Sequence, residues 1–315
     1  MGVDEIRAAA HRIRGVAVRT PLLAWDERTW LKPENLQPIG AFKIRGAHAR
    51  ITALTEAQRA AGVISYSSGN HARAVARSAR LLGIRAVIVM PSDAPAVKVA
   101  GVEGDGAEIV RCDPGSEVRR RIAEELGVRH GYTIVPPYDD PEIIAGQGTV
   151  GLEVAEDLPR VTSVLVPVGG GGLISGVAAA VKVLAPDARV VGVEPDAAAD
   201  ARDSLLAGEI VSWPAERTGR TIADGLRVSA VGSLPFAHLR ALVDEIVTVS
   251  DEEIRAGMRE LAARARLIAE PSGAAAMAAH LAGRVPQPAG DDARVVVISG
   301  GNVDPALLAE VLGGG

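Results

Sequence analysis

The sequence has few cysteines and few aromatic residues. Cys112 is the one cysteine among 315 residues, which excludes an internal disulfide and a cysteine-rich zinc site. This usage favours a reducing compartment, so we expect a cytoplasmic protein. Aromatic residues make up 3% of the chain, which leaves few rings for stacking on single-stranded nucleic acid.

An excess of positive charge is also missing. Lys and Arg number 34 against 39 Asp and Glu, a net charge of −5, whereas a nucleic-acid-binding protein would show a basic stripe. We therefore expect no nucleic-acid partner. Residues 161–181 carry no charge, but five glycines and a proline interrupt them. That pattern favours a strand, a loop and a helix over a membrane span, so we expect no membrane association.

Short apolar runs alternate with longer amphipathic stretches, which predicts parallel α/β sheets. A chain of 315 residues usually divides into two domains. Four strands between 63 and 135 could form a small sheet, and the other strands need a larger one. Asp251, with Ser250 beside it, is expected to cap the helix at 251–266. Strands are expected at 63–66, 86–90, 107–110, 132–135, 161–168, 189–194, 245–249 and 294–299, and helices at 70–82, 116–126, 142–157, 173–184, 251–266 and 304–312.

Four consecutive glycines are the strongest local signal. They follow the expected strand 161–168 and open the helix 173–184. Glycines let the backbone turn tightly and point successive N–H groups at one anion, to which the positive end of the helix dipole adds. No lysine follows in Walker position, and the spacing fits a dinucleotide fingerprint poorly. The loop indicates phosphate binding or, alternatively, a flexible turn at Gly169, Gly170, Gly171 and Gly172.

Two further polar loops follow expected strands. SSGNH occupies 67–71 after one strand, and SGGN occupies 299–302 after another. Either loop can be a plain helix cap or turn. Because loops at the carboxyl ends of parallel strands gather at one crevice, we expect these loops and the glycine loop to meet.

Lys43 lies between two apolar residues, Phe42 and Ile44. A lone lysine on an amphipathic helix is usually solvated and protonated at pH 7, and it becomes nucleophilic only when buried or covalently bound. The apolar neighbours make burial possible. A phosphate-binding loop, a lysine that can form a Schiff base, an amide and a neutral hydroxyl are together what a pyridoxal phosphate enzyme needs.

Six segments resemble, in their order along the chain, the motifs of fold-type II pyridoxal phosphate enzymes. The resemblance is closest to threonine/serine dehydratases and serine racemases, and it covers about residues 5–310. The segments are KPENLQPIGAFKIRGA (32–47), SSGNH (67–71), AGQGT (145–149), PVGGGGL (167–173), EPSGAA (270–275) and SGGN (299–302).

The resemblance implies roles for the matching residues. Lys43 would carry the cofactor as an internal aldimine, with Phe42 packed against the ring. Asn70 would contact the ring hydroxyl, Ser299 the ring nitrogen, and Gly169 to Gly172 the phosphate. The 67–71 loop would hold the substrate carboxylate through Ser67, Ser68, Asn70 and His71.

Ser68 and a second cluster are further expectations. In racemase relatives the serine before Gly-Asn-His is the acid/base group opposite the lysine, and Ser68 stands there, although capping is the alternative. Glu194, Ala198 and Asp200 follow a strand with the spacing E-x-x-x-A-x-D. Two carboxylates and a carbonyl suit Mg²⁺ or Ca²⁺, and racemase-like relatives bind a divalent cation at matching positions. A solvated acidic loop is the alternative.

The resemblance also implies an architecture. Two open, twisted parallel-sheet domains of the tryptophan synthase β-like type would hold the cofactor in the cleft between them. The larger domain would comprise residues 1–52 and 141–315, and the smaller one residues 53–140. A homodimer is the family precedent.

The implied activity is a dehydratase that converts L-threonine, L-serine or both to a 2-oxo acid and ammonia. The segment beginning at Tyr138 (YDD, 138–140) resembles the dehydratase form of the substrate-side loop more than the racemase form. The alternatives are an amino acid racemase, a 3-hydroxyaspartate dehydratase, or a ligand-sensing protein without turnover. Retention of Lys43 argues against the last of these.

Overall fold

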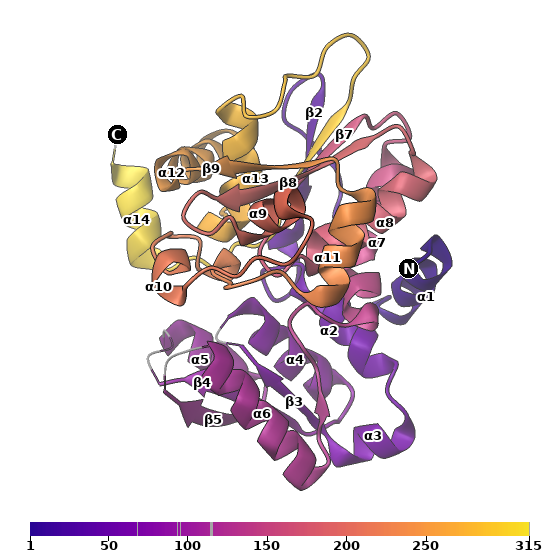
Figure 1. The fold of residues 1–315 in the computed structure, drawn as a ribbon, viewed down its shortest axis with the longest axis vertical. Helices are drawn as coiled ribbons and strands as arrows, with labels where there is room; N and C mark the ends of the chain where they lie inside the picture. Colours follow the sequence, from indigo (N-terminus) through magenta and orange to yellow (C-terminus); the bar gives the residue numbers. More distant parts are fainter. Residues whose placement is uncertain (68, 93, 95, 114–115, 315) are drawn as a thin grey trace.

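The computed structural model describes residues 1–67, 69–92, 94, 96–113 and 116–314. Its strands form two separate sheets, as the alternating sequence pattern predicts. Figure 1 shows them in two lobes, with α2 between the lobes. The helices are α1 (Val3–Arg12), α2 (Lys43–Thr52), α3 (Glu56–Ala61), α4 (Asn70–Leu81), α5 (Ala96–Gly104), α6 (Ser116–His130), α7 (Pro141–Asp157), α8 (Gly172–Leu184), α9 (Asp200–Ala207), α10 (Ala215–Thr218), α11 (Ser233–Leu242), α12 (Asp251–Glu260), α13 (Pro271–Leu281) and α14 (Pro305–Gly313), with 3-10 turns at Glu34–Leu36 and Asp224–Leu226 and a π-helical turn at Leu261–Ala265.

The larger sheet has six strands in the order β1-β2-β10-β7-β8-β9. All of its pairings are parallel except β1 with β2, which is antiparallel. The central strands β7 and β10 are buried along their whole length, because helices cover both faces of the sheet. The strands are β1 (Leu23–Ala24), β2 (Thr29–Pro33), β7 (Ser163–Pro167), β8 (Arg189–Pro195), β9 (Glu245–Val249) and β10 (Arg294–Ile298).

The smaller sheet has four parallel strands in the order β5-β4-β3-β6. They lie within the range 53–140 that the sequence assigns to the smaller domain. The strands are β3 (Val63–Tyr66), β4 (Ala86–Pro91), β5 (Glu108–Cys112) and β6 (Thr133–Ile134). Two parallel-sheet domains confirm the predicted fold class.

Helices α7 and α8 pack at backbone contact, which fixes the start of α8 beside the larger sheet. A Cβ atom on Gly176 would lie 2.3 Å from the carbonyl oxygen of Ile144, so only glycine permits this approach. The uncharged segment 161–181 is therefore a strand, a loop and a helix, as predicted. Among the described residues, no helix is both long and apolar enough to span a bilayer.

A buried charge cluster fixes α2, the helix that begins at Lys43. The Nε and Nη1 atoms of Arg45 donate to Glu34 at 2.7 Å and to Glu153 at 2.6 Å. Lys32 donates to the other carboxylate oxygen of Glu153 at 2.6 Å. Buried charges are tolerated when each is paired and hydrogen-bonded, and the cluster links β2, α2 and α7.

One local prediction is wrong. Ser250, not Asp251, is the N-cap of α12, since its side chain accepts from the backbone N–H of Glu253 while the Glu253 side chain accepts from the backbone N–H of Ser250. This reciprocal capping box satisfies two otherwise unpaired backbone donors. Asp251 is the first helical residue, and it accepts hydrogen bonds from Thr221 and from the backbone N–H of Ile222.

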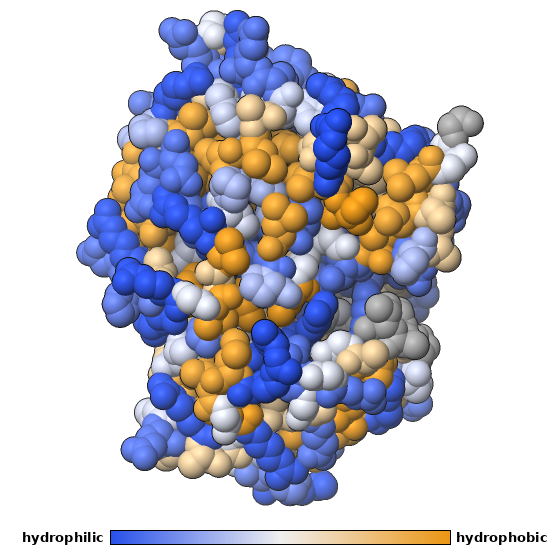
Figure 2. Space-filling model, turned by 180° about the vertical axis from the view of Figure 1, so that it is seen from behind, coloured by the Kyte–Doolittle hydropathy of each residue, from blue (hydrophilic) through white to orange (hydrophobic). Residues whose placement is uncertain are grey.

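All three tryptophans lie outside residues 53–140, and each has an arginine over its ring. The guanidinium carbon is 3.8 Å from the ring centre of Trp25, 4.8 Å from that of Trp30 and 3.1 Å from that of Trp213. Seen from behind, apolar residues are visible on both halves of the molecule, with the broader areas on the half that holds the larger sheet (Figure 2).

Candidate active site

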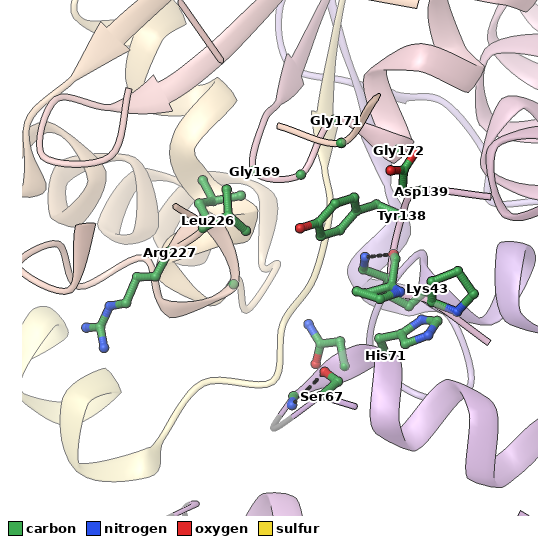
Figure 3. Close-up of a pocket in the computed structure, with 18 of the residues that line it drawn as sticks. Lys43, Ser67, His71, Tyr138, Asp139, Gly169, Gly171, Gly172, Leu226 and Arg227 are labelled. Atoms are coloured by element: carbon green, nitrogen blue, oxygen red, sulfur yellow. Dashed lines mark hydrogen bonds between the residues drawn. The ribbon is translucent and has the colours of Figure 1, made fainter. Parts of the chain in front are cut away.

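A pocket of about 590 Å³ lies between the two sheets, at the carboxyl ends of their strands. The loops after β3, β7 and β10 contribute to its lining, together with the start of α2. The structure thus brings together the three loops that the sequence predicts to meet. In Figure 3, Tyr138 lies between the glycine loop and Lys43, with His71 and Ser67 beyond Lys43.

Lys43 is the first residue of α2, and its amine lies in this pocket. The Nζ atom donates to the carbonyl oxygen of Pro137 at 2.7 Å and lies 5.1 Å from the ring centre of Phe42. Burial lowers the pKa of the Lys43 amine to about 8, because removal from water disfavours the charged form. The Lys43 residue is half-buried, so the burial that the sequence makes possible is present in part.

The glycine loop is a cradle of backbone with no room for side chains. Gly171 has φ of +88°, which glycine adopts without strain, and it is the N-cap of α8. A Cβ atom on Gly170 would lie 2.2 Å from Cδ1 of Tyr138. The first backbone N–H groups of α8 lack partners within the helix, so the loop can bind a phosphate.

Ser299 and Phe42 are joined through the backbone, since the Phe42 N–H donates to the carbonyl oxygen of Ser299 at 3.1 Å. The Ser299 side chain is 4% exposed and lines the pocket, and its hydroxyl donates to the carbonyl oxygen of Ser272 at 3.5 Å. A hydroxyl rather than a carboxylate therefore stands at the end of β10. This geometry suits the neutral partner of a ring nitrogen that the sequence predicts.

The 67–71 loop leads into α4 on the opposite wall. Ser67 accepts a hydrogen bond from the Gly69 N–H at 3.2 Å. His71 Nε2 lies 3.0 Å from the carbonyl oxygen of Val135, and because a carbonyl only accepts, Nε2 carries the proton. Burial lowers the pKa of His71 to about 3, so its ring is neutral. Ser68 lies outside the described residues.

The neutral His71 ring changes how a carboxylate could be held. Its Nδ1 atom can only accept a hydrogen bond, so the ring cannot donate to a carboxylate. Donors that line this wall are the Ser67 hydroxyl, the Asn70 amide and the first backbone N–H groups of α4, which lack partners within the helix and carry the positive end of its dipole.

The segment 137–140 is a part of the site whose contacts the sequence did not reveal. Besides holding Lys43 through Pro137, it caps α11, because Asp139 accepts from the N–H groups of Ser233 and Leu234 at 3.0 and 2.9 Å. Asp140 caps α7 in the same way. No sequence motif predicts these contacts. The one available signal is the pair of aspartates in YDD (138–140), since aspartate is favoured at helix N-caps.

The sequence predicts no role for four further polar residues at this site, namely Glu270, Asn302, Lys98 and Asp224. Glu270 lines the pocket, and Asn70 Nδ2 donates to its Oε1 at 2.5 Å. Lys98 of the smaller lobe forms an ion pair with Asp224 of the larger one, and both line the pocket. Glu270 and Asn302 belong to motifs already noted, EPSGAA and SGGN, which gave the only available signal.

The expected metal residues do not line the pocket, and the Glu194 and Asp200 carboxyls lie close enough to interact. Glu194 accepts from the N–H groups of Ala201 and Arg202, and both carboxylate oxygens of Asp200 are buried without a hydrogen-bond partner among the described residues. Ala198, the third expected ligand, is also buried. Burial raises the pKa of Asp200 to about 7. The described residues contain no cluster of three or more His, Cys, Asp or Glu side chains suited to a metal.

Comparison with known proteins defines the class. The profile described as pyridoxal-phosphate dependent enzyme matches residues 13–301. The chain belongs to this family. The pocket fits the family's cofactor, since it combines a backbone cradle closed to side chains with a half-buried amine and a neutral hydroxyl.

Individual relatives carry three different names. The chain is 42% identical to the serine racemase of Schizosaccharomyces pombe over 98% of this chain and 96% of that protein. It is 40% identical to the L-threo-3-hydroxyaspartate ammonia-lyase of Saccharomyces cerevisiae, with the same coverage of each. The crystal structure of the T.th. threonine deaminase has a TM-score of 0.89 and 42% identity, covering 96% of this chain and 99% of that one. Similar identities leave the chain in the ammonia-lyase and racemase group of the family.

Proposed function

We propose that this protein is an ammonia-lyase that converts L-serine, L-threonine or both to a 2-oxo acid and ammonia by β-elimination. The observation that carries the proposal is the half-buried Lys43 amine, which shares one pocket with the glycine loop and the neutral Ser299 hydroxyl. The threonine deaminase named above has the same fold over nearly its whole length.

Each residue has a defined task in this reaction. Bound pyridoxal phosphate supplies a carbonyl that captures the substrate amino group and a ring that accepts the electron pair released at Cα. Lys43 removes the Cα proton, and an amine with a pKa of about 8 is partly neutral near pH 7 and can act as a base. The first-turn N–H groups of α4 hold the carboxylate.

Ser299 favours elimination in particular. With pyridoxal phosphate bound, the neutral Ser299 hydroxyl would not protonate the ring nitrogen, so the ring would hold negative charge from Cα only weakly. The β-hydroxyl would then leave as water, taking the proton that Lys43 removed from Cα. The enamine that is released reacts with water to give the 2-oxo acid and ammonia.

The test is product formation from L-serine, L-threonine and L-threo-3-hydroxyaspartate, with and without added pyridoxal phosphate. Ammonia and 2-oxo acid from serine or threonine support the proposal. Conversion of L-serine to D-serine as the main reaction would make the protein a racemase, and turnover of hydroxyaspartate alone would make it a hydroxyaspartate lyase. Binding without any product would identify a ligand-sensing protein.

The Ser68→Ala variant separates elimination from racemisation. Racemisation needs acid/base groups on both faces of Cα, and Lys43 serves one face. We expect the alanine variant to lose D-serine turnover and to keep much of the L-serine elimination, as measured by chiral chromatography and oxo-acid assay. Wild-type D-serine turnover in Ser68→Ala would show that the second base is another group.

Glu194, Ala198 and Asp200 bind Mg²⁺ or Ca²⁺ in this proposal, with the ion acting structurally. Two buried carboxylates repel each other, and a divalent cation would relieve that repulsion. We expect 1 mM Mg²⁺ to raise the thermal midpoint of chelator-treated protein by roughly 2–4 °C, the shift that about 1 kcal/mol gives in a chain of this size. Asp200→Asn should lose this response, and an equal response in Asp200→Asn would exclude the site.

A homodimer is part of the same proposal. The apolar face over the larger sheet supports it, since apolar surface of this kind is commonly covered by a partner (Figure 2). The mass of the purified protein by light scattering is the test, and a monomer at working concentration would exclude it.

A further inference from the structure

Glu270 is a buried carboxyl that the proposed mechanism does not use. It is the N-cap residue of α13, is 4% exposed and lines the pocket. A Cβ atom on Gly300 would lie 2.1 Å from its Oε1 atom, so the glycine after Ser299 makes room for this carboxyl. The SGGN segment therefore packs directly against the Glu270 side chain of the EPSG segment.

The hydrogen bonds around Glu270 determine the orientation of one amide. Asn302 Nδ2 donates to the carbonyl oxygen of Ile39 at 2.8 Å, and because that oxygen can only accept, the Asn302 amide has one orientation. The same Nδ2 atom donates to Asn70 Oδ1 at 2.8 Å. Asn70 must then turn its Nδ2 group to Glu270, where the distance to Oε1 is 2.5 Å.

Among the described residues, this arrangement leaves one hydrogen of the Asn70 amide without a partner. A side-chain amide has two N–H donors, and Glu270 takes one of them. The second remains for a group bound in the pocket, which Asn70 lines. Asn70 begins α4 in the smaller lobe, whereas Glu270 and Asn302 come from the larger one, so these contacts also join the two lobes.

We propose that Glu270 is a positioning residue that, with Asn302, locks the Asn70 amide so that its second Nδ2 hydrogen is presented to the ring oxygen of the cofactor. This inference rests on the proposed function, because it presumes that the pocket binds pyridoxal phosphate. Neither Glu270 nor Asn302 needs to touch the reacting atoms.

The surroundings of Glu270 support this role. Burial raises the pKa of its carboxyl to about 8, with a further contribution from the Asp224 carboxylate. At neutral pH the group is therefore mostly protonated and uncharged, and it does not repel an oxygen anion on the ring. Glutamine has the same shape and a carbonyl oxygen that can accept the Asn70 hydrogen bond, so Glu270→Gln should preserve the orientation of the Asn70 amide.

The test is a double-mutant cycle on cofactor affinity, measured by absorbance and fluorescence titration of apoprotein with pyridoxal phosphate. We expect Glu270→Ala to raise the Kd about tenfold, the loss of roughly one net hydrogen bond to the cofactor. Glu270→Gln should stay close to wild type. In the Asn70→Ala background, Glu270→Ala should change the Kd by less than about twofold, because residues that act through one contact are not additive.

Asn302→Ala provides a second route to the same result if Glu270→Ala fails to fold, as judged by its thermal midpoint. It should raise the Kd in wild type and not in Asn70→Ala. Glu216→Ala, at an exposed glutamate on α10, is the matched control and should change nothing.

The outcomes are distinct. If Glu270→Ala leaves the Kd unchanged, or raises it equally in the Asn70→Ala background, Glu270 does not act through Asn70 and the inference is overturned. If the wild-type protein itself does not bind pyridoxal phosphate, the proposed function fails instead.

Discussion

Lys43→Ala should lower turnover of L-serine or L-threonine by at least about 10³-fold, because it removes the base that takes the Cα proton. The purified variant should also lose the visible absorbance of bound cofactor. Lys43 lines the pocket, with its Nζ atom 2.7 Å from the Pro137 carbonyl oxygen, whereas Lys98, the other lysine of the pocket lining, is held in an ion pair with Asp224. Ammonia release and the absorbance spectrum are the two measurements.

Lys182→Ala is the matched control. Lys182 lies on α8 and donates to the Ala188 carbonyl oxygen and to Asp244, away from the pocket lining. This variant should keep both the absorbance and the turnover. Full activity in Lys43→Ala would contradict the mechanism, whatever the state of the glycine loop.

Gly170→Asp should strongly weaken the binding of pyridoxal phosphate. Its Cβ atom would lie 2.2 Å from Cδ1 of Tyr138, which is far inside van der Waals contact, and its carboxylate would repel the phosphate. We expect the Kd to rise by at least about 100-fold, the combined cost of roughly 3 kcal/mol for overpacking and charge repulsion. Titration of the apoprotein measures the change, and far-UV circular dichroism shows whether the fold is kept.

Two variants separate the causes. Gly170→Ala tests the steric part alone and should weaken binding less than Gly170→Asp does. Gly104→Asp places the same side chain where no atom lies within 4 Å of the new Cβ, and it should leave the Kd unchanged. Unchanged affinity in Gly170→Asp would mean that the phosphate is bound elsewhere.

The sequence predicts the strands β3 to β10, including β5 and β9, which are only partly buried. β7 and β10 are apolar runs buried along their whole length, which gives the clearest pattern that a strand can have. β2 was missed because its sequence, TWLKP, contains a lysine and a proline. Lys32 is tolerated there because its amine donates to the Thr20 carbonyl oxygen and pairs with Glu153, a contact 121 positions away that no local pattern reveals.

In the candidate site, too, features with a local sequence signature could be predicted and contacts between distant segments could not. Glycine loops at strand ends have a local physical signature, so their meeting could be predicted, and Lys43 could be named from its motif. The contacts of Pro137, Asp139 and Glu270 depend on how the two lobes face each other. His71 illustrates the limit, since the sequence places it in the loop but only the Val135 contact reveals which nitrogen carries its proton.

The positions of the tryptophans give the protein a built-in optical reporter. Because Trp25, Trp30 and Trp213 all lie outside residues 53–140, intrinsic indole emission monitors the larger lobe alone. The arginine over each ring is held there by the folded chain, so the emission should change when that lobe unfolds. Helix content measured by circular dichroism reports on both lobes. A denaturant titration in which the two signals diverge would show that the lobes unfold in separate steps, and coincident curves would show one cooperative unit.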